Sequence, residues 1–146
     1  MNNIFMKEAI KEAKKAFLKN EVPVGAVVVK NGEIISKAHN LCEKNGNPTQ
    51  HAEILAINKA LKKLNTNRLN GCELYVTLEP CPMCAGAIIN ARLDEVIFGA
   101  FDLKGGAVSS KVDLFNKGFN HKPVVFEGIL EKECSMLLTE FFKDKR

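Results

Sequence analysis

Two short apolar runs joined by a helix-length segment constrain the fold of this chain more than any other feature. The runs lie at residues 74–78 and 95–99, and Pro80 and Pro82 open a helix between them that continues to Ala91. Proline suits this place because the first-turn amides of a helix lack partners anyway. Two strands connected through a helix pair in parallel. The segment therefore predicts an α/β fold.

The dipeptide Asn31-Gly32 predicts an antiparallel hairpin, because it lies between two strand-like runs, residues 22–29 and 33–36. Residues 124–126 form a weaker strand-like run, which brings the expected mixed sheet to about five strands. Helical periodicity marks the segments around the sheet, and the polar stretch between the second strand and the second helix reads as a loop. The expected helices are 4–19, one that begins near His51, the one that residues 80–82 open and that continues to Ala91, and 131–142. The expected loop is 40–50.

The length of 146 residues fits one domain over 1–146, and no linker composition interrupts it. No apolar run approaches the roughly 18 residues that would span a membrane, and the start of the chain lacks the apolar core of a signal peptide. Five cysteines form an odd set for a disulfide framework, which favours a reducing cytoplasm. We therefore expect a cytoplasmic protein without a membrane segment.

The net charge of +4 is compatible with a polyanionic partner but is no nucleic-acid signature by itself. Four lysines of the first helix recur four positions apart, which favours a solvated helix face over an RNA contact. These are Lys7, Lys11, Lys15 and Lys19.

One set of residues carries metal-binding chemistry. Cys81 and Cys84 lie three positions apart at a helix start, so both sulfurs can face one point, and the positive end of the helix dipole favours their thiolate forms. Soft thiolates at this spacing select zinc, and His51 is the natural third ligand because it too begins a helix after a loop. Three protein ligands leave a fourth position open for water, which is typical of catalytic zinc.

Glu53 lies two residues from His51, where it can reach the open position without binding the metal. Water on such a zinc ion loses a proton easily, and a carboxylate in that place can accept the proton and deliver it elsewhere. The pair His51 and Glu53 therefore indicates general acid/base catalysis.

Two other interpretations of these residues compete with a catalytic zinc. A lone Cys-x-x-Cys can be a redox pair, but that role leaves His51 and Glu53 unexplained. A structural zinc site needs a fourth ligand, and the candidates show no paired spacing with the first three. Those candidates are His39, Cys42, Cys72 and Cys134.

His-x-Glu followed by Pro-Cys-x-x-Cys resembles the signature of the zinc-dependent cytidine and adenosine deaminases. Within that superfamily the chain is similar to the bacterial tRNA adenosine deaminases from about Glu21 to Phe142. The segments that carry this likeness are 21–27, Asn40, 48–49, 74–80, 85–87 and 99–107.

The resemblance implies a three-layer α/β/α fold of the cytidine-deaminase type with a mixed five-stranded sheet. It also implies an enzyme with one zinc ion per chain, which acts as a homodimer. The implied reaction is the hydrolytic deamination of the wobble adenosine to inosine in a tRNA anticodon stem-loop.

By the same resemblance, each site residue receives a role. His51, Cys81 and Cys84 would bind zinc and Glu53 would move protons. Asn40 would hydrogen-bond the flipped nucleoside, and the backbone around Ala52 and the side of Val76 would help shape the base pocket. Asp102 and Lys104 would meet the neighbouring nucleotides, and the last helix, with Phe141, Phe142 and the basic residues Lys143, Lys145 and Arg146, would lean on the RNA.

Other members of the superfamily keep a second function open, namely a deaminase of free guanine, cytosine or a nucleoside. Both functions use every zinc residue, and the features that favour RNA are loop 99–107 and the basic end of the chain. A catalytically dead nucleic-acid binder is disfavoured because Glu53 is present. Phe101 and Ser109 depart from the family pattern, and Phe101 is expected either to stack on a base or to pack against protein.

Overall fold

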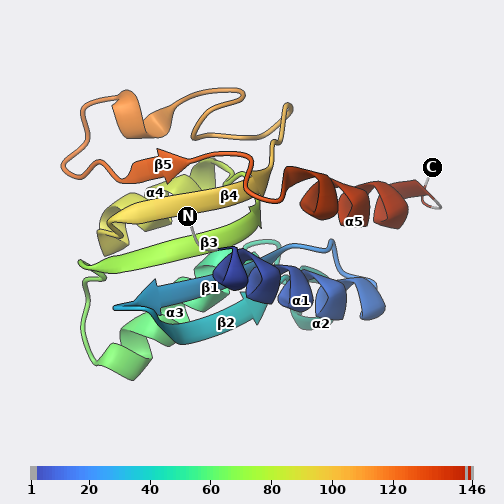
Figure 1. The fold of residues 1–146 in the computed structure, drawn as a ribbon, viewed down its shortest axis with the longest axis horizontal. Helices are drawn as coiled ribbons and strands as arrows, with labels where there is room; N and C mark the ends of the chain where they lie inside the picture. Colours follow the sequence, from blue (N-terminus) through green and yellow to red (C-terminus); the bar gives the residue numbers. More distant parts are fainter. Residues whose placement is uncertain (1–2, 144, 146) are drawn as a thin grey trace.

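The computed structural model describes residues 3–143 and 145, and these form a five-stranded sheet between helices (Figure 1). The strand order is β2-β1-β3-β4-β5. Strand β1 is antiparallel to β2 and β3, whereas β3, β4 and β5 run parallel, so the mixed sheet predicted from the sequence is confirmed. The strands are β1 (Gly25–Lys30), β2 (Glu33–His39), β3 (Cys72–Leu78), β4 (Glu95–Ala100) and β5 (Val124–Phe126).

Helices cover both faces of the sheet, which gives three layers. Figure 1 shows α1 and α5 in front of the sheet, with α3 and α4 behind it. The bounds are α1 (Ile4–Leu18), α3 (Ala52–Leu64), α4 (Pro82–Ala91) and α5 (Glu131–Lys143), and two short pieces are α2 (Cys42–Asn45) and the 3₁₀ helix η1 (Leu114–Asn116). Over residues 3–143, no helix has both the length and the apolar character needed to cross a membrane.

Each strand divides its side chains between two cores, because successive residues of a strand point to opposite faces. In β1, Val27 and Val29 pack toward α1 and α5, whereas Ala26 and Val28 pack toward α3 and α4. All four are fully buried. Burying one valine side chain contributes about 1.5–3 kcal/mol, so burial on both faces explains why β1 reads as a continuous apolar run.

The hairpin between β1 and β2 has the geometry that its sequence predicts. Asn31 has φ 51° and Gly32 has φ 77°, and both central residues of this turn type need positive φ. Strand β1 begins at Gly25, three residues later than predicted. Pro23 has no amide to pair and the Val24 amide bonds to the Val22 carbonyl, so residues 22–24 form a tight turn before the sheet.

The loop expected at 40–50 contains the unpredicted helix α2. Its first-turn amides, from Glu43 and Lys44, donate to the carboxylate of Glu21 at 3.0 and 2.8 Å. Glu21 is 1% exposed and lies 22 residues away in the chain. Because a tertiary contact stabilises this four-residue helix, no local periodicity could reveal it.

Gly25 lies where α1 crosses the start of β1. A Cβ atom at this position would lie 2.0 Å from the Ala9 carbonyl oxygen and 2.6 Å from the Ala13 nitrogen, and both are backbone atoms. Backbone atoms of a packed helix cannot move aside one at a time, so only glycine allows this close approach.

We expect Gly25→Ala to lower the free energy of unfolding by about 1–3 kcal/mol, the usual cost of overpacking. Gly86→Ala is the matched control, because a Cβ there meets nothing within 4 Å. Alanine in the interior of α4 should stabilise the protein by about 0.5–1 kcal/mol. Urea unfolding of both variants measures the difference, and equal midpoints would contradict it.

Candidate active site

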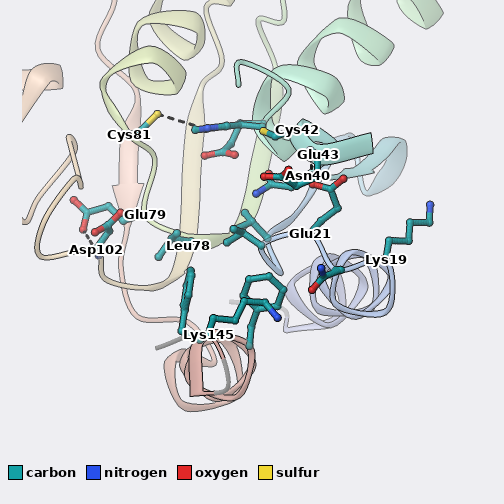
Figure 2. Close-up of a pocket in the computed structure, with 17 residues that line it drawn as sticks. Lys19, Glu21, Asn40, Cys42, Glu43, Leu78, Glu79, Cys81, Asp102 and Lys145 are labelled. Atoms are coloured by element: carbon teal, nitrogen blue, oxygen red, sulfur yellow. Dashed lines mark hydrogen bonds between the residues drawn. The ribbon is translucent and has the colours of Figure 1, made fainter. Parts of the chain in front are cut away.

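A cleft of about 550 Å³ opens beyond the carboxyl ends of β3 and β4 (Figure 2). Ligands of open α/β sheets bind at this edge, because the loops that follow the parallel strands converge there. The cleft is bounded on one side by α2 and the end of α1, on another by loop 101–110, and below by the end of α5. Its lining includes Lys19, Glu21, Asn40, Cys42, Glu43, His51, Glu53, Leu78, Glu79, Cys81, Asp102, Phe141, Phe142 and Lys145.

His51, Cys81 and Cys84 converge at the base of this cleft. Their ligand atoms lie within 4.8 Å of one another, and His51 Nδ1 is 3.6 Å from each sulfur. Two thiolates and an imidazole around a tetrahedral zinc ion would hold nitrogen and sulfur about 3.5 Å apart. The donor set therefore fits zinc both in spacing and in chemistry. The three residues predicted as ligands thus come together in the structure.

Two helix starts bring these ligands together. His51 is the N-cap of α3 and Cys81 is the N-cap of α4, and both have extended backbone. Cys84 lies in the first turn of α4, and its backbone amide donates a hydrogen bond to the Cys81 sulfur. Because both helices point their positive ends at this spot, the field favours thiolates over thiols.

The two cysteines share one proton in the absence of a metal ion. A hydrogen bond from the Cys84 thiol lowers the pKa of Cys81 to about 4, and the same bond, together with burial, raises the pKa of Cys84. The hydrogen bond to Cys81 raises the pKa of His51, although burial opposes this. A bound dication would deprotonate both thiols outright, and the raised proton affinity of Cys84 makes metal binding sensitive to acid.

Glu53 lines the same cleft and is 3% exposed. Burial raises the pKa of its carboxyl group to about 7, because the charged form loses solvation there. A group that titrates near neutral pH can both accept and donate a proton at that pH. The structure thus places the predicted proton carrier beside the predicted metal ligands.

The other candidate ligands lie outside this group. His39 Nδ1 pairs with Glu12 at 2.9 Å, and its Nε2 lies 3.1 Å from Lys19 Nζ. Cys72 and Cys134 are buried in the two cores, and Cys42 lines the cleft without belonging to the donor group. In the described part of the chain, only three residues offer ligand atoms to one metal ion, which leaves room for a water ligand.

Asn40 connects the end of β2 to the start of α3. Its Oδ1 accepts a hydrogen bond from the Ala52 amide at 2.8 Å, and its side chain lines the cleft. This bond uses the amide oxygen, so the Asn40 Nδ2 group is the donor that can meet a substrate. Ala52 itself is fully buried and contributes its backbone rather than its methyl group.

Asp102 lines the cleft, whereas Val76 and Lys104 are outside its lining. Val76 is fully buried against α3 and α4, and the residue of β3 that reaches the cleft is Leu78. Lys104 is exposed, and its amide donates to Asp102 Oδ1 at 3.2 Å. The ring of Phe101 packs edge-on against that of Phe98, with the ring centres 5.1 Å apart. Packing against protein was one of the two roles expected for Phe101.

Two buried carboxylates of the cleft wall, Glu21 and Glu79, have no role predicted from the sequence. Both occur in segments that carry the family likeness, but acidic residues beside apolar strands usually read as exposed. Their partners are backbone amides from distant loops, and such partners leave no trace in composition or spacing. Helix α5 and the residues after it deliver Phe141, Phe142 and Lys145 to the cleft, whereas Arg146 lies outside the described residues.

The fold and the donor set define a deaminase. The family model of the MafB19-like deaminases matches residues 1–146. The chain is 54% identical to a tRNA-specific adenosine deaminase of Bacillus subtilis over 99% of this chain and 91% of that protein. It is 53% identical to a tRNA-specific adenosine deaminase of Aquifex aeolicus, over 97% of this chain and 94% of that protein. The chain belongs to the tRNA-specific adenosine deaminases of this deaminase family.

Solved structures agree with this assignment and confirm the predicted fold. A chain from a study of A-to-I editing by tRNA:A34 deaminases superposes with a TM-score of 0.92 at 43% identity, covering 94% of this chain and all of that one. A guanine deaminase of Bacillus subtilis superposes with a TM-score of 0.66 at 32% identity, covering 82% of this chain and 88% of that one. The fold is thus shared with enzymes that are named for different substrates.

We expect the purified protein to carry one zinc ion per chain, and Cys81→Ala and Cys84→Ala to lose it. Cys42→Ala is the matched control, because this cysteine lines the cleft without belonging to the donor group. Metal analysis by mass spectrometry measures the zinc-to-protein ratio, and mild acid should release the ion from the unmodified protein. Retention of a full equivalent by Cys81→Ala would refute this ligand set.

Proposed function

We propose that the chain hydrolyses adenosine to inosine at the wobble position of a tRNA anticodon loop, as one catalytic domain with one zinc ion. The geometry that carries this proposal is the buried Glu53 beside the group His51, Cys81 and Cys84 at the base of an open cleft. The named relatives supply the substrate, since they are tRNA-specific adenosine deaminases at 44–54% identity. A base within a loop must leave its stack to enter such a cleft.

His51 through Nδ1, Cys81 and Cys84 hold the zinc ion. When bound, the ion supplies the Lewis acidity that makes water a nucleophile near neutral pH. Glu53 accepts one proton of the attacking water and delivers it to the purine ring nitrogen. It then passes the second proton of that water to the amino group, which leaves as the bond from C6 to the amino nitrogen breaks. Water and adenosine thereby become inosine and ammonia. The raised pKa of Glu53 suits both directions of proton transfer.

Asn40 orients the flipped nucleoside. Its Oδ1 is held by the Ala52 amide at 2.8 Å, so its Nδ2 group has a fixed direction and can donate to an acceptor on the nucleoside. Because the same bond ties Asn40 to the first residue of α3, the substrate contact and the ligand His51 keep a constant separation. A preorganised donor of this kind loses little entropy on binding.

Cations and aromatic rings at the mouth of the cleft meet the rest of the RNA. Lys19 and Lys145 line it, and Lys145 Nζ lies 4.6 Å from the centre of the Phe141 ring. Figure 2 shows these lysines on two different sides of the cleft. Asp102 and Lys104 meet the nucleotides beside the target. Phosphate contacts hold the strand, and exposed aromatic faces such as that of Phe142 receive splayed bases.

The protein acts as a homodimer in the cytoplasm. The resemblance to the tRNA adenosine deaminases supports the dimer, and cytoplasmic tRNA is the proposed substrate. Sedimentation at micromolar concentration tests the dimer, since a single chain has a mass of 16.1 kDa.

A free-base deaminase is the second candidate, because the guanine deaminase of Bacillus subtilis shares the fold at 32% identity. The higher identity to the tRNA enzymes and the lysines at the cleft mouth favour RNA. A free base is much smaller than this open cleft and has no phosphate for the lysines to bind.

We expect Glu53→Gln to keep its zinc and to lower turnover by about 100- to 10,000-fold, the usual contribution of general acid/base catalysis. Glu43→Gln is the control, an exposed carboxylate in the same cleft, and should stay within a few-fold of the unmodified enzyme. The value of kcat/KM should fall as the pH drops through about 7, because Glu53 must be deprotonated to accept a proton. Activity of Glu53→Gln within tenfold would exclude this role.

We expect an anticodon stem-loop with adenosine at the wobble position to be deaminated faster than guanine, cytosine or free adenosine. RNA turnover at low substrate should weaken with salt, and replacing both Lys19 and Lys145 with alanine should flatten the logarithmic slope by about 0.7 for each phosphate that is no longer neutralised. The control replaces Lys62 and Lys63, exposed near the end of α3. If guanine were deaminated faster than the stem-loop, tRNA would be ruled out as the preferred substrate, but the prediction of a zinc site would still stand.

A further inference from the structure

Loop 101–110 folds around one carboxylate, that of Glu79. Its Oε2 accepts hydrogen bonds from the Ser109 and Ser110 amides at 2.9 and 2.8 Å, and from the Val108 amide at 3.4 Å. Its Oε1 accepts from the Asp102 amide at 3.1 Å and from the Ser110 hydroxyl. Both oxygens are thus saturated by the two ends of a single loop.

Glu79 has no cation to balance it. It is 2% exposed, and within residues 3–143 it forms no ion pair. A buried carboxylate without a cation depends on the donors around it, and here all of the donors belong to this loop. The dependence is mutual, because the loop amides would be left without partners if the carboxylate were removed.

The loop also packs closely against the segment that carries the metal ligand Cys81. The Glu79 amide donates to the Ala100 carbonyl at 2.8 Å, and the Ala107 amide donates to the Pro80 carbonyl at 2.9 Å. A Cβ atom at Gly106 would lie 2.3–2.4 Å from the Glu79 carboxylate. The loop is therefore hydrogen-bonded to, and closely packed against, residues 79–81.

Asp102 is the residue whose direction this arrangement sets. Its amide binds Glu79, and its Oδ1 accepts from the amides of Lys104 and Gly105 at 3.2 and 3.0 Å. Figure 2 shows Glu79 and Asp102 together on one wall of the cleft, joined by the hydrogen bond. The wall that faces the substrate is thus built on a side chain two residues before a metal ligand.

We propose that Glu79 is a positioning residue for RNA binding, which holds loop 101–110 in the conformation that receives the nucleotides beside the target base. This inference rests on the proposed tRNA substrate. Glu79 acts through the loop and touches neither the reacting atoms nor the metal ion. Preorganising the loop removes an ordering cost that RNA binding would otherwise carry.

Steady-state kinetics on the anticodon stem-loop separate positioning from a general effect on stability. We expect Glu79→Gln to raise KM on the order of 10- to 100-fold, because RNA binding must then order the loop, with kcat within about threefold and one zinc ion per chain. Ser110→Ala removes one of the five donors and should raise KM by a smaller factor. Ile97→Val, a buried change on the α1 and α5 side of the sheet, should lower the melting temperature without changing KM.

A substitution in the loop itself can also disturb the Glu79 carboxylate. Gly106→Ala must displace the Glu79 side chain and should raise KM as Glu79→Gln does. Gly86→Ala is its control, because it lies outside this loop and a Cβ there meets no atom within 4 Å, so its KM should stay within about twofold. Amide hydrogen exchange provides a readout without substrate, since residues 108–110 should lose protection in both Glu79→Gln and Gly106→Ala.

Three results would overturn the proposal. They are an unchanged KM in Glu79→Gln, equal KM values for Gly106→Ala and Gly86→Ala, and a fall in kcat that follows loss of zinc. If the unmodified protein fails to deaminate the stem-loop at all, the proposed function itself is rejected and this inference with it. A stem-loop that is deaminated with a KM indifferent to Glu79 rejects only the inference.

Discussion

The convergence of two helix starts at one edge of the sheet is the constraint on which the rest of the structure depends. His51 caps α3, Cys81 caps α4, and the histidine nitrogen lies 3.6 Å from both sulfurs. The parallel pairing of β3 and β4 makes this possible, because the crossover helix must begin at the edge where β3 ends. A donor set placed in this way needs no long loop to support it, and its geometry follows from the packing of α3 and α4 on one face.

Three buried glutamates around the cleft show that the same carboxyl group behaves differently in different surroundings. Burial dominates at Glu53, so its pKa rises to about 7 and it can move protons. Glu21 and Glu79 instead accept backbone amides, from the first turn of α2 and from loop 101–110 respectively. They hold opposite walls of the cleft. The surroundings of a buried carboxyl group thus decide whether its proton affinity changes or whether it organises the backbone around it.

Elements that depend on local interactions were predictable from the sequence, whereas those that depend on distant contacts were not. The Asn31-Gly32 turn and the first helix follow from local conformational preferences and periodicity, so residues a few positions apart suffice to predict them. The start of β1 was misplaced because the turn at Val22 to Val24 competes with strand pairing. Helix α2 was missed because its stability comes from Glu21, a residue outside the helix.

The sequence by itself determined the chemistry of the site. The spacing of Cys81 and Cys84 at a helix start, with His51 before another, already predicts a metal site, because ligand type and local helix geometry are properties of short segments. Only the tertiary structure decided how the cleft is enclosed. It joined Glu79 to amides about 30 residues away, brought α5 to the cleft mouth and buried Val76 while exposing Leu78 to the cleft. Those contacts depend on long-range packing, which no local pattern of residue types encodes.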